Sequence, residues 1–361
     1  LPQHGTGSGN VQPGSMAGAR RGEDDRACQR RLRRIYALSS EEIPIMSEIK
    51  IFVSHRIDRN SVLIQNPLYI PIRCGAVFDE KDPRGLLGDD TGDNISPKRQ
   101  TFCEFTVQYW VWKNVQADYY GLCHYRRYLS FAKKRYPVNE HHMVHLKALL
   151  PQDKHRYGLL NRKRMQRIIE DYDIIASEPA PVCKIPTPAG PQKTVREMWD
   201  AHDGTFFEKS TIDLMFRLID ELSPEYSVSA REYFAGNYHR GYNCYVLRRE
   251  LFDRLCQFQF PILFELERRL DMSGYNDSMK RTPGYVGEML YGIFLYHVIT
   301  RERWKVKELQ LVFIDDVECP TTALEWIWRQ LRYGGERLLR AIIDPVLPLG
   351  SPGREWIKKQ F

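Results

Sequence analysis

The sequence predicts an α/β fold in which a mostly parallel sheet is covered by helices on both faces. Short apolar runs typical of buried strands alternate along the chain with longer segments of helical periodicity. Parallel strands need a helical crossover between them, and this alternation supplies it. No internal repeat is visible in the chain.

Each element is expected where its own pattern is clearest. Strands are predicted where β-branched and aromatic residues cluster, at residues 49–55, 68–76, 119–125, 172–177 and 242–247. Helices are predicted where apolar residues recur every three or four positions, at 101–116, 161–172, 209–222 and 248–270. The Pro-rich stretch 177–192 is too irregular for either element, so we expect a mobile loop near the site.

Three regions are expected along the chain. Residues 1–45 are rich in Gly, Ser, Gln and Arg and have no apolar core, which indicates a disordered arm or a remnant of upstream sequence. Residues 46–318 hold the alternating elements and form the predicted domain. Residues 319–361 form a tail with seven basic and four acidic side chains and three of the seven tryptophans, Trp326, Trp328 and Trp356. A basic amphipathic tail with Trp is typical of a membrane interface, and packing against the domain is the alternative.

Composition narrows the class of protein. A net charge of +7 suits a polyanionic partner, an anionic membrane surface or a nucleoside diphosphate, but the charge is too dispersed to indicate nucleic acid. The eight cysteines include no C-x-x-C pair and lie mostly in apolar runs, as expected of reduced thiols in the cytoplasm. No run approaches the roughly 18 apolar residues of a membrane span.

The segment DYYGLCHYRRYL, residues 118–129, carries the clearest functional pattern. A buried strand ends in His124, Tyr125, Arg126 and Arg127, and ligands bind at strand ends in α/β sheets. Two adjacent guanidiniums offer fixed donors that match phosphate oxygens, so they indicate a phosphorylated ligand. The alternative is that both arginines pair with surface carboxylates.

An acidic loop, GDDTGDNIS at residues 88–96, lies upstream of this strand. Its glycines and short polar side chains cannot form regular structure. Asp89, Asp90 and Asp93 are candidate oxygen ligands for Mg²⁺ or Mn²⁺. A solvated acidic turn is the other interpretation.

These motifs resemble a known family. GDDTGDNIS, YWVWKN and DYYGLCHYRRYL, followed by HDGTFFEKSTIDLM, YNCYVLRRELFDRL, PILFELERRL and PGYVGEMLYGIFL, are similar to the bacterial capsular and exopolysaccharide biosynthesis proteins that are regarded as glycosyltransferases. The resemblance covers roughly residues 47–315 in order. Two segments depart from the family pattern, namely GNYHRG before Tyr242 and VGEML around Glu288.

The resemblance implies a GT-A-like fold with a single nucleotide-binding domain. In that fold a strand usually ends in an Asp-x-Asp that holds a metal on the donor diphosphate. Here the strand ends in His124, Arg126 and Arg127, and these cationic groups can neutralise the leaving diphosphate in place of a metal. We therefore expect metal-independent transfer without a cofactor, with the three aspartates as the alternative metal site.

Transfer to a sugar hydroxyl also needs a base, for which Glu288 is the first candidate. TPGYVGEMLYGIF places it after a Gly-containing turn at the start of an apolar helix, where the helix dipole favours an ionised carboxylate. By resemblance to inverting enzymes of this fold, Glu288 implies an inverting reaction. Asp203 is the alternative base. A structural carboxylate at a helix start is the other interpretation of Glu288.

Four further residues are candidate ligand contacts. Asn243 heads an apolar strand and, with His202, is a candidate for sugar or acceptor binding, although either side chain would also suit a structural role. Asp93 and Asn94 lie in the loop expected to meet the nucleoside, with helix capping as their alternative role.

The sequence as a whole predicts a cytoplasmic glycosyltransferase, peripheral on the inner membrane. It would move a hexose from a nucleotide sugar, with uridine diphosphate as the expected carrier, to a glycan or lipid-linked acceptor. A non-catalytic protein that binds the nucleotide sugar or glycan is the alternative, and a nucleic-acid-binding module is a distant third.

Overall fold

The computed structural model describes residues 47–79, 84–320 and 322–343. The described residues belong to one compact unit, Ser47–Phe361. The predicted arm at residues 1–45 and the last part of the predicted tail lie outside the described residues. The domain boundary predicted at residue 318 falls within this unit and stays a prediction.

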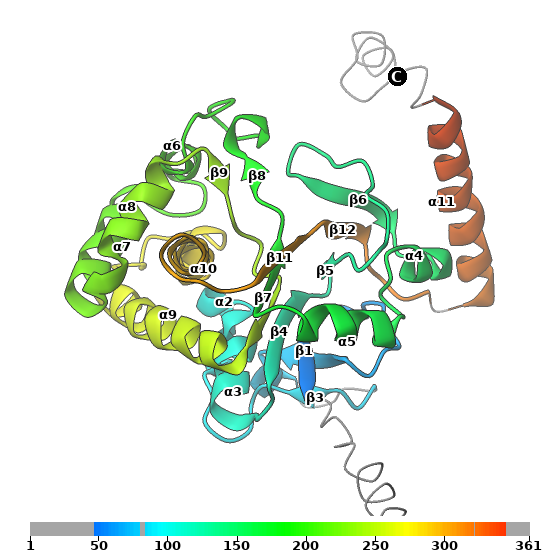
Figure 1. Cartoon of the computed structure of the whole chain (residues 1–361), viewed down its shortest axis with the longest axis horizontal. Coiled ribbons are helices and arrows are strands. Elements are labelled where there is room, and N and C mark those ends of the chain that lie inside the picture. Colours follow the sequence, from blue (N-terminus) through cyan, green and yellow to red (C-terminus); the bar gives the residue numbers. More distant parts are fainter. Residues whose placement is uncertain (1–46, 80–83, 321, 344–361) are drawn as a thin grey trace, which may run out of the picture. The chain divides into compact units, whose positions relative to one another are not determined.

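A ten-stranded mixed sheet forms the centre of the domain (Figure 1). Seven strands follow one path, in the order β11 (Val306–Leu309), β7 (Ile174–Ser177), β10 (Tyr245–Arg248), β4 (Tyr119–His124), β1 (Ile49–Arg56), β2 (Tyr69–Cys74) and β3 (Leu87–Gly88). Only β10 runs antiparallel to both of its neighbours on this path, and the other four pairs are parallel. The predicted, mostly parallel α/β sheet is confirmed.

Three more strands extend the sheet beyond β4. They are β5 (Arg127–Leu129), β6 (Met143–Ala148) and β12 (Leu311–Asp316). β5 pairs antiparallel with both β4 and β12, and β12 pairs parallel with β6. Separately, β8 (Ala180–Pro181) and β9 (Tyr238–His239) form a two-stranded ribbon. The turn between β4 and β5, which carries Arg126, is therefore fixed by paired strands at both ends.

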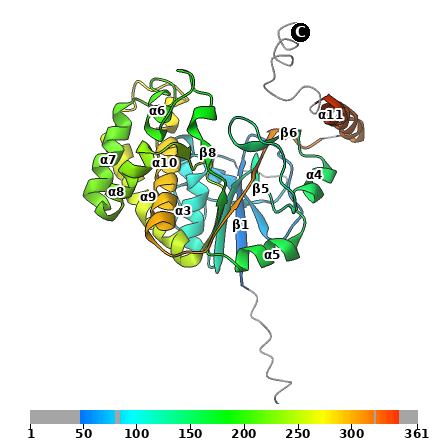
Figure 2. The same cartoon turned by 45° about the horizontal axis from the view of Figure 1, so that its top comes forward.

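Two hydrophobic cores occupy the two faces of the sheet. Because side chains alternate along a strand, Phe52 of β1 packs in one core and Ile51 and Val53 pack in the other. Figures 1 and 2 show the larger helical layer on one side and α5 on the other. The larger layer comprises α3 (Phe105–Asn114), α7 (Ser210–Leu222), α8 (Ser227–Ala235), α9 (Arg249–Arg269) and α10 (Thr282–Arg301). The opposite core includes Met165 and Ile169 of α5 (Arg162–Glu170).

The short helices and the tail complete the described chain. They are α2 (Arg99–Phe102), α4 (Pro151–Arg156), α6 (Val195–Asp200) and α11 (Ala323–Ile343). None of the helices found is long and apolar enough to cross a membrane, as far as the described residues go. The Pro-rich stretch 177–192 holds β8 and a 3₁₀ turn at Val182–Lys184, so it is more ordered than predicted.

The helix predicted at residues 101–116 is instead broken into α2 and α3. Cys103, between them, has φ of 52°, in the left-handed region. Its carbonyl accepts hydrogen bonds from Cys74 Sγ at 3.1 Å and from the Thr106 N–H at 3.3 Å, and these contacts hold the break. The break turns Cys103 and Glu104 toward the cavity described below.

Candidate active site

A cavity of about 780 Å³ opens at the carboxyl ends of β1, β2 and β4. Ser54 and Arg56 reach it from β1, Cys74 from β2 and His124 from β4. Parallel strands end at this edge, which is where open α/β sheets bind ligands. The remaining lining residues come from the turn after β2, the segments around α2, the β4–β5 turn and β5, the segment before α10, α10 itself and β12. They are Phe78, Pro97, Arg99, Gln100, Cys103, Glu104, Tyr125, Arg126, Arg127, Asp277, Arg281, Gly284, Tyr285, Glu288 and Phe313.

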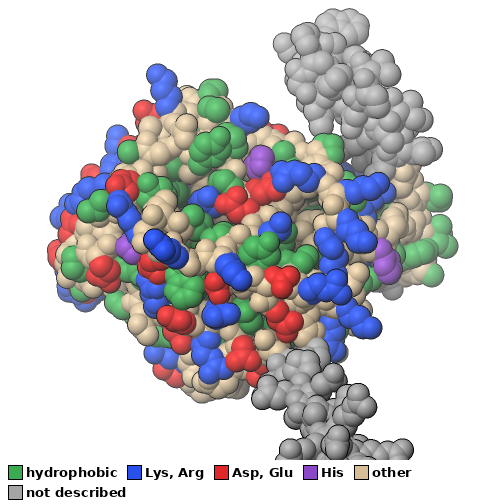
Figure 3. All heavy atoms as spheres, in the orientation of Figure 1, with side chains coloured by type: hydrophobic (Ala, Val, Ile, Leu, Met, Phe, Trp, Pro, Cys, Tyr) green, Lys and Arg blue, Asp and Glu red, His purple; other side chains and the backbone are tan. Residues whose placement is uncertain are grey.

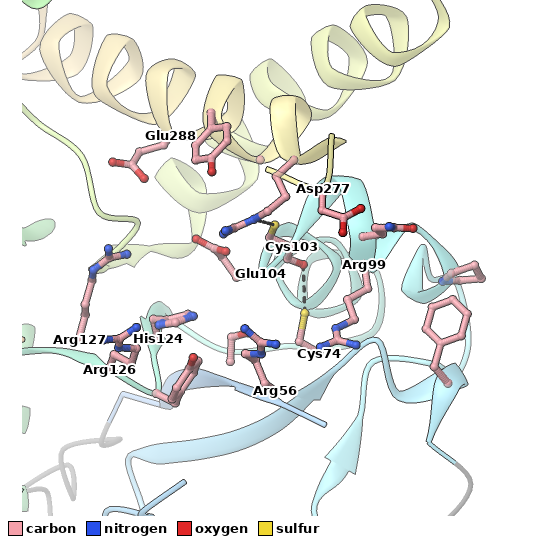
Figure 4. A pocket seen from close by; sticks show the side chains of 18 of the residues that line it. Arg56, Cys74, Arg99, Cys103, Glu104, His124, Arg126, Arg127, Asp277 and Glu288 are labelled. Carbon is pink, nitrogen blue, oxygen red and sulfur yellow. Dashed lines mark hydrogen bonds between the residues drawn. The ribbon is translucent and has the colours of Figure 1, made fainter. Parts of the chain in front are cut away.

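Arg126 and Arg127 lie on one wall with His124, as predicted (Figure 4). The Arg126 guanidinium lies 4.9 Å from the Phe313 ring centre and its Nε donates to the Ile314 carbonyl at 3.2 Å. The Arg127 guanidinium lies 5.4 Å from the Tyr242 ring centre, and its buried Nε has no hydrogen-bond partner. Within the described residues neither arginine forms an ion pair. Their charges are therefore available to a ligand.

His124 faces the same space in its neutral form. Burial lowers the pKa of its imidazole well below the ordinary value, and the charges of Arg127 and Arg126 lower it further. Its Nδ1 is buried and has no hydrogen-bond partner. A neutral imidazole can donate from one ring nitrogen and accept at the other, so His124 contributes hydrogen bonding rather than charge.

Three further arginines line the cavity and were not singled out from the sequence. Arg56 and Arg99 share Asp58, with Arg99 Nη2 at 3.0 Å from the carboxylate. Arg281 donates from Nε to Cys103 Sγ at 3.2 Å. Arg56 ends strand β1 as Arg126 follows β4, so the strand-end criterion would have found it. Five arginines and three carboxylates line the cavity, an excess of two positive charges.

Glu288 lies on α10 across from the arginine wall (Figure 4). It is in the second turn of the helix and not at its start as predicted, because α10 already begins at Thr282. The helix-terminal amides therefore do not hold it. Instead its Oε1 accepts the Tyr242 backbone N–H at 3.0 Å and lies 3.6 Å from His239 Nε2. Burial alone would raise its pKa, but His239, Arg127 and the Tyr242 amide together hold the pKa below its ordinary value.

A second cavity carboxylate, Glu104, was missed because the sequence predicted it inside a continuous helix. Glu104 Oε1 accepts a hydrogen bond from Asn243 Nδ2 at 3.1 Å. Asn243 is buried and does not itself line the cavity. Its amide therefore positions Glu104, and the direct sugar contact predicted for Asn243 is not supported by this placement. Tyr242 and Asn243, which hold the two carboxylates, both have left-handed φ, 74° and 43°.

Asp203 and His202 lie outside the cavity lining. Asp203 is exposed, and its Oδ1 accepts the Lys209 N–H at 2.7 Å, which closes a turn. The His202 ring stacks on Phe206 at 4.3 Å between centres, and Phe206 stacks on the cavity residue Tyr285 at 4.5 Å. Burial lowers the His202 pKa. His202 thus supports the cavity wall through stacked rings, and Asp203 is not brought to the site.

The acidic loop 88–96, named as the alternative metal site, holds its aspartates in different surroundings. Asp89 is fully buried, and its carboxylate accepts the backbone N–H groups of Gly75 and Ala76 and the hydroxyls of Ser96 and Thr106. Asp90 is exposed beside it. In the described part of the chain, no three or more His, Cys, Asp or Glu side chains are grouped so as to hold a metal ion.

Asp93 and Asn94, the two predicted nucleoside contacts, form hydrogen bonds that hold loop 88–96 in place. Asp93 Oδ1 accepts the Tyr109 hydroxyl at 3.1 Å, and Asn94 Oδ1 accepts the Ser96 N–H at 3.2 Å. Neither residue lines the cavity, nor does any residue of the Pro-rich stretch 177–192. Asn94 closes a turn within the loop, and Asp93 ties the loop to α3. Neither side chain caps the 3₁₀ turn at Ser96–Lys98, whose N-cap residue is Ile95.

The sheet, its helical layers and the strand-end cavity define a GT-A-like α/β protein. The chain belongs to the family described as Domain of unknown function (DUF4422), whose pattern matches residues 50–300. It is similar to the apo structure of the bifunctional glycosyltransferase WbbM, with 29% identity and a TM-score of 0.68. That match covers 76% of this chain and 48% of WbbM, so the chain spans about half of that protein. No curated protein matches the sequence.

We predict that Asp89 is a structural residue. Asp89→Ala would leave two buried amides and two hydroxyls without an acceptor, so it should lower the free energy of unfolding by about 2–4 kcal/mol. Urea denaturation of the variant measures this loss. Asp90→Ala, at the exposed neighbour, is the matched control and should stay within about 0.5 kcal/mol of the parent protein. Equal stability of the two variants would contradict the structural role.

Proposed function

We propose that the chain is a glycosyltransferase that moves a hexose from a nucleotide sugar, with uridine diphosphate as carrier, onto a glycan or lipid-linked acceptor. The observation that carries the proposal is one cavity in which two unpaired arginines face an ionised, hydrogen-bonded carboxylate. The similarity to WbbM supports the reaction class. The resemblance to capsular and exopolysaccharide proteins supports a role in capsule, exopolysaccharide or O-antigen synthesis.

In this proposal Arg126 and Arg127 bind the donor diphosphate. Negative charge develops on the leaving phosphate as the glycosidic bond breaks, and fixed cations in a partly desolvated cavity stabilise it. Arg126 and Arg127, which form no ion pair within the described residues, supply two positive charges, as many as the negative charges of a diphosphodiester. His124, neutral beside the arginines, donates or accepts one additional hydrogen bond.

Glu288 is the proposed general base. It would take the proton of the acceptor hydroxyl while the hydroxyl oxygen attacks the anomeric carbon from the face opposite the diphosphate. A single displacement of this kind inverts the anomeric centre. Asp203 is a weaker candidate because its carboxylate closes an exposed turn. Glu104, held by Asn243, is placed to accept hydrogen bonds from sugar hydroxyls.

We further propose that α11 contacts the inner membrane surface from the cytoplasmic side. Leu324, Ile327, Trp328 and Leu331 recur at helical spacing and are between 48% and 76% exposed. Figure 3 shows hydrophobic side chains at the outer edge of this helix. The free thiols of the described cysteines are compatible with a reducing compartment.

Removing either wall arginine should weaken diphosphate binding. Arg126→Ala and Arg127→Ala each delete a charge-assisted contact, which is worth about 1–3 kcal/mol. Calorimetric titration with uridine diphosphate measures the change. Arg162→Ala on the exposed face of α5 removes the same net charge and should leave affinity unchanged. Parent-like affinity in both wall variants would end this assignment.

Transfer should survive chelation. The arginines supply the positive charge that a metal provides in other enzymes of this fold, so EDTA should leave turnover of a nucleotide sugar unchanged. Product release is followed as free nucleoside diphosphate. Loss of turnover in EDTA, with recovery on adding Mn²⁺ or Mg²⁺, would show that a metal is required.

Glu288→Gln should lower kcat by about 10²- to 10⁴-fold with little change in donor affinity, since it preserves shape but removes the proton acceptor. Asp203→Asn is the control and should remain active. NMR coupling at the new linkage should report inversion. Near-normal kcat in Glu288→Gln would return Glu288 to a structural role and move the search for the base to Asp203. Absence of turnover in the parent protein would favour a non-catalytic binding protein.

Binding to vesicles that contain anionic lipid should depend on the exposed stripe of α11. The double variant Trp328→Ser, Leu331→Ser removes apolar area that would be buried in the interface, so it should float less with the vesicles than the parent protein. Leu222→Ser, at an exposed leucine of α7, is the matched control. Equal flotation of all three proteins would contradict a membrane role for α11.

A further inference from the structure

A buried chain of side chains leads from Glu288 away from the cavity. His239 of β9 has a side chain that is 3% exposed, and its Nε2 lies 3.6 Å from Glu288 Oε1. On the other side of the ring, its Nδ1 lies 3.3 Å from the Tyr233 hydroxyl. Trp199 and Tyr242 pack edge-to-face against the imidazole, at 5.7 and 5.5 Å between ring centres. The ring is thus fixed with one nitrogen toward each neighbour.

Two glycines make room for this chain. A Cβ built on Gly241 would lie 2.5 Å from Glu288 Oε1 and closer still to His239 Nε2. A Cβ on Gly292 of α10 would overlap the Tyr233 hydroxyl and lie 2.6 Å from the Arg240 carbonyl oxygen. Any side chain at either position would therefore separate the histidine from one of its two neighbours.

The Tyr233 hydroxyl can serve both protonation states of His239. It accepts the Arg240 N–H at 2.9 Å and can donate to the Arg240 carbonyl at 3.1 Å. With the carbonyl as its acceptor, the hydroxyl oxygen remains open to an Nδ1–H of a cationic imidazole. When the imidazole is neutral, the hydroxyl can instead donate to Nδ1. In both arrangements Nε2 carries the hydrogen that faces Glu288.

We propose that His239, supported by the Tyr233 hydroxyl, is a positioning residue that orients Glu288 and keeps it in its carboxylate form. His239 does not line the cavity, so it acts through Glu288 and does not touch the substrate. The consequence for catalysis rests on the proposed function, because only there is Glu288 a base. The positioning itself depends on the contacts alone.

Groups other than His239 also shift the Glu288 pKa, and a test of His239 has to take them into account. Arg127, the first residue of β5, and the Tyr242 amide favour the charged form of Glu288, whereas burial opposes it. The Tyr233 and Tyr242 phenols have raised pKa values, chiefly through burial and in part through the Glu288 charge, so they stay neutral. His141 faces both Arg127 and His239, and burial lowers its pKa. Removing His239 should therefore raise the Glu288 pKa without abolishing its ionisation.

The test measures this carboxylate directly, without substrate. Carbon NMR of glutamate labelled at the side-chain carboxyl, with the Glu288 signal assigned by its absence in Glu288→Gln, gives the Glu288 pKa. His239→Phe keeps the ring and removes both nitrogens, so the pKa should rise by about 1–3 pH units. His239→Gln keeps an N–H donor, so the Glu288 pKa should rise less in that variant. His297→Phe, on α10, is the matched control and should leave the Glu288 pKa unchanged.

The outcomes separate this proposal from the proposed function. Parent-like Glu288 pKa values in both folded His239 variants would overturn the positioning role, and the glutamine variant provides the measurement if His239→Phe does not fold. A raised pKa accompanied by an equal shift of the acidic limb of the kcat profile supports both proposals. A raised pKa without a shift of that limb supports the positioning of Glu288 and counts against its role as base.

Discussion

The candidate site depends on hydrogen bonds from two adjacent residues, Tyr242 and Asn243, to two partly buried carboxylates. The Tyr242 amide binds Glu288 and the Asn243 side chain binds Glu104. A carboxylate in a partly desolvated cavity is costly unless donors compensate it. Both residues have left-handed φ, a conformation that costs about 1–3 kcal/mol for a residue such as Tyr242 and persists only where its surroundings enforce it. The strained backbone of Tyr242 and Asn243 therefore lies where these residues bind the two carboxylates of the candidate site.

The cavity walls differ in how their charges are compensated. Arg56 and Arg99 share Asp58, and Arg281 contacts the Cys103 sulfur, so these cations have protein partners. Arg126 and Arg127 rest against aromatic rings and a carbonyl instead. Aromatic faces attract a guanidinium without neutralising it. The charges on the first wall are thus compensated within the protein, whereas the second wall keeps its positive potential toward Glu288 on α10.

The sequence predicted the features that depend on local pattern. Strand composition located β1, β2, β4 and β7, and the strand-end rule located His124, Arg126 and Arg127 in the cavity. The features that depend on tertiary contacts were missed. The break at Cys103 depends on a hydrogen bond from Cys74 of β2, which the local sequence does not reveal. The sequence pattern therefore predicts that Glu104 is an ordinary position within a continuous helix. Likewise, composition marks loop 88–96 as acidic but cannot show that Asp89 points inward to four donors.

The way the β4–β5 turn is anchored bears on the thermodynamics of ligand capture. His124 pairs with Arg127 across the turn, and β5 pairs in turn with β12. A guanidinium on a loose loop loses backbone freedom when it binds an anion, and that entropy loss weakens binding. In this turn the backbone is already ordered by folding, and the Phe313 and Tyr242 rings limit the side-chain rotamers as well. The conformational entropy of these arginine donors is therefore lost when the protein folds. Binding of an anion in the cavity need not reduce it further.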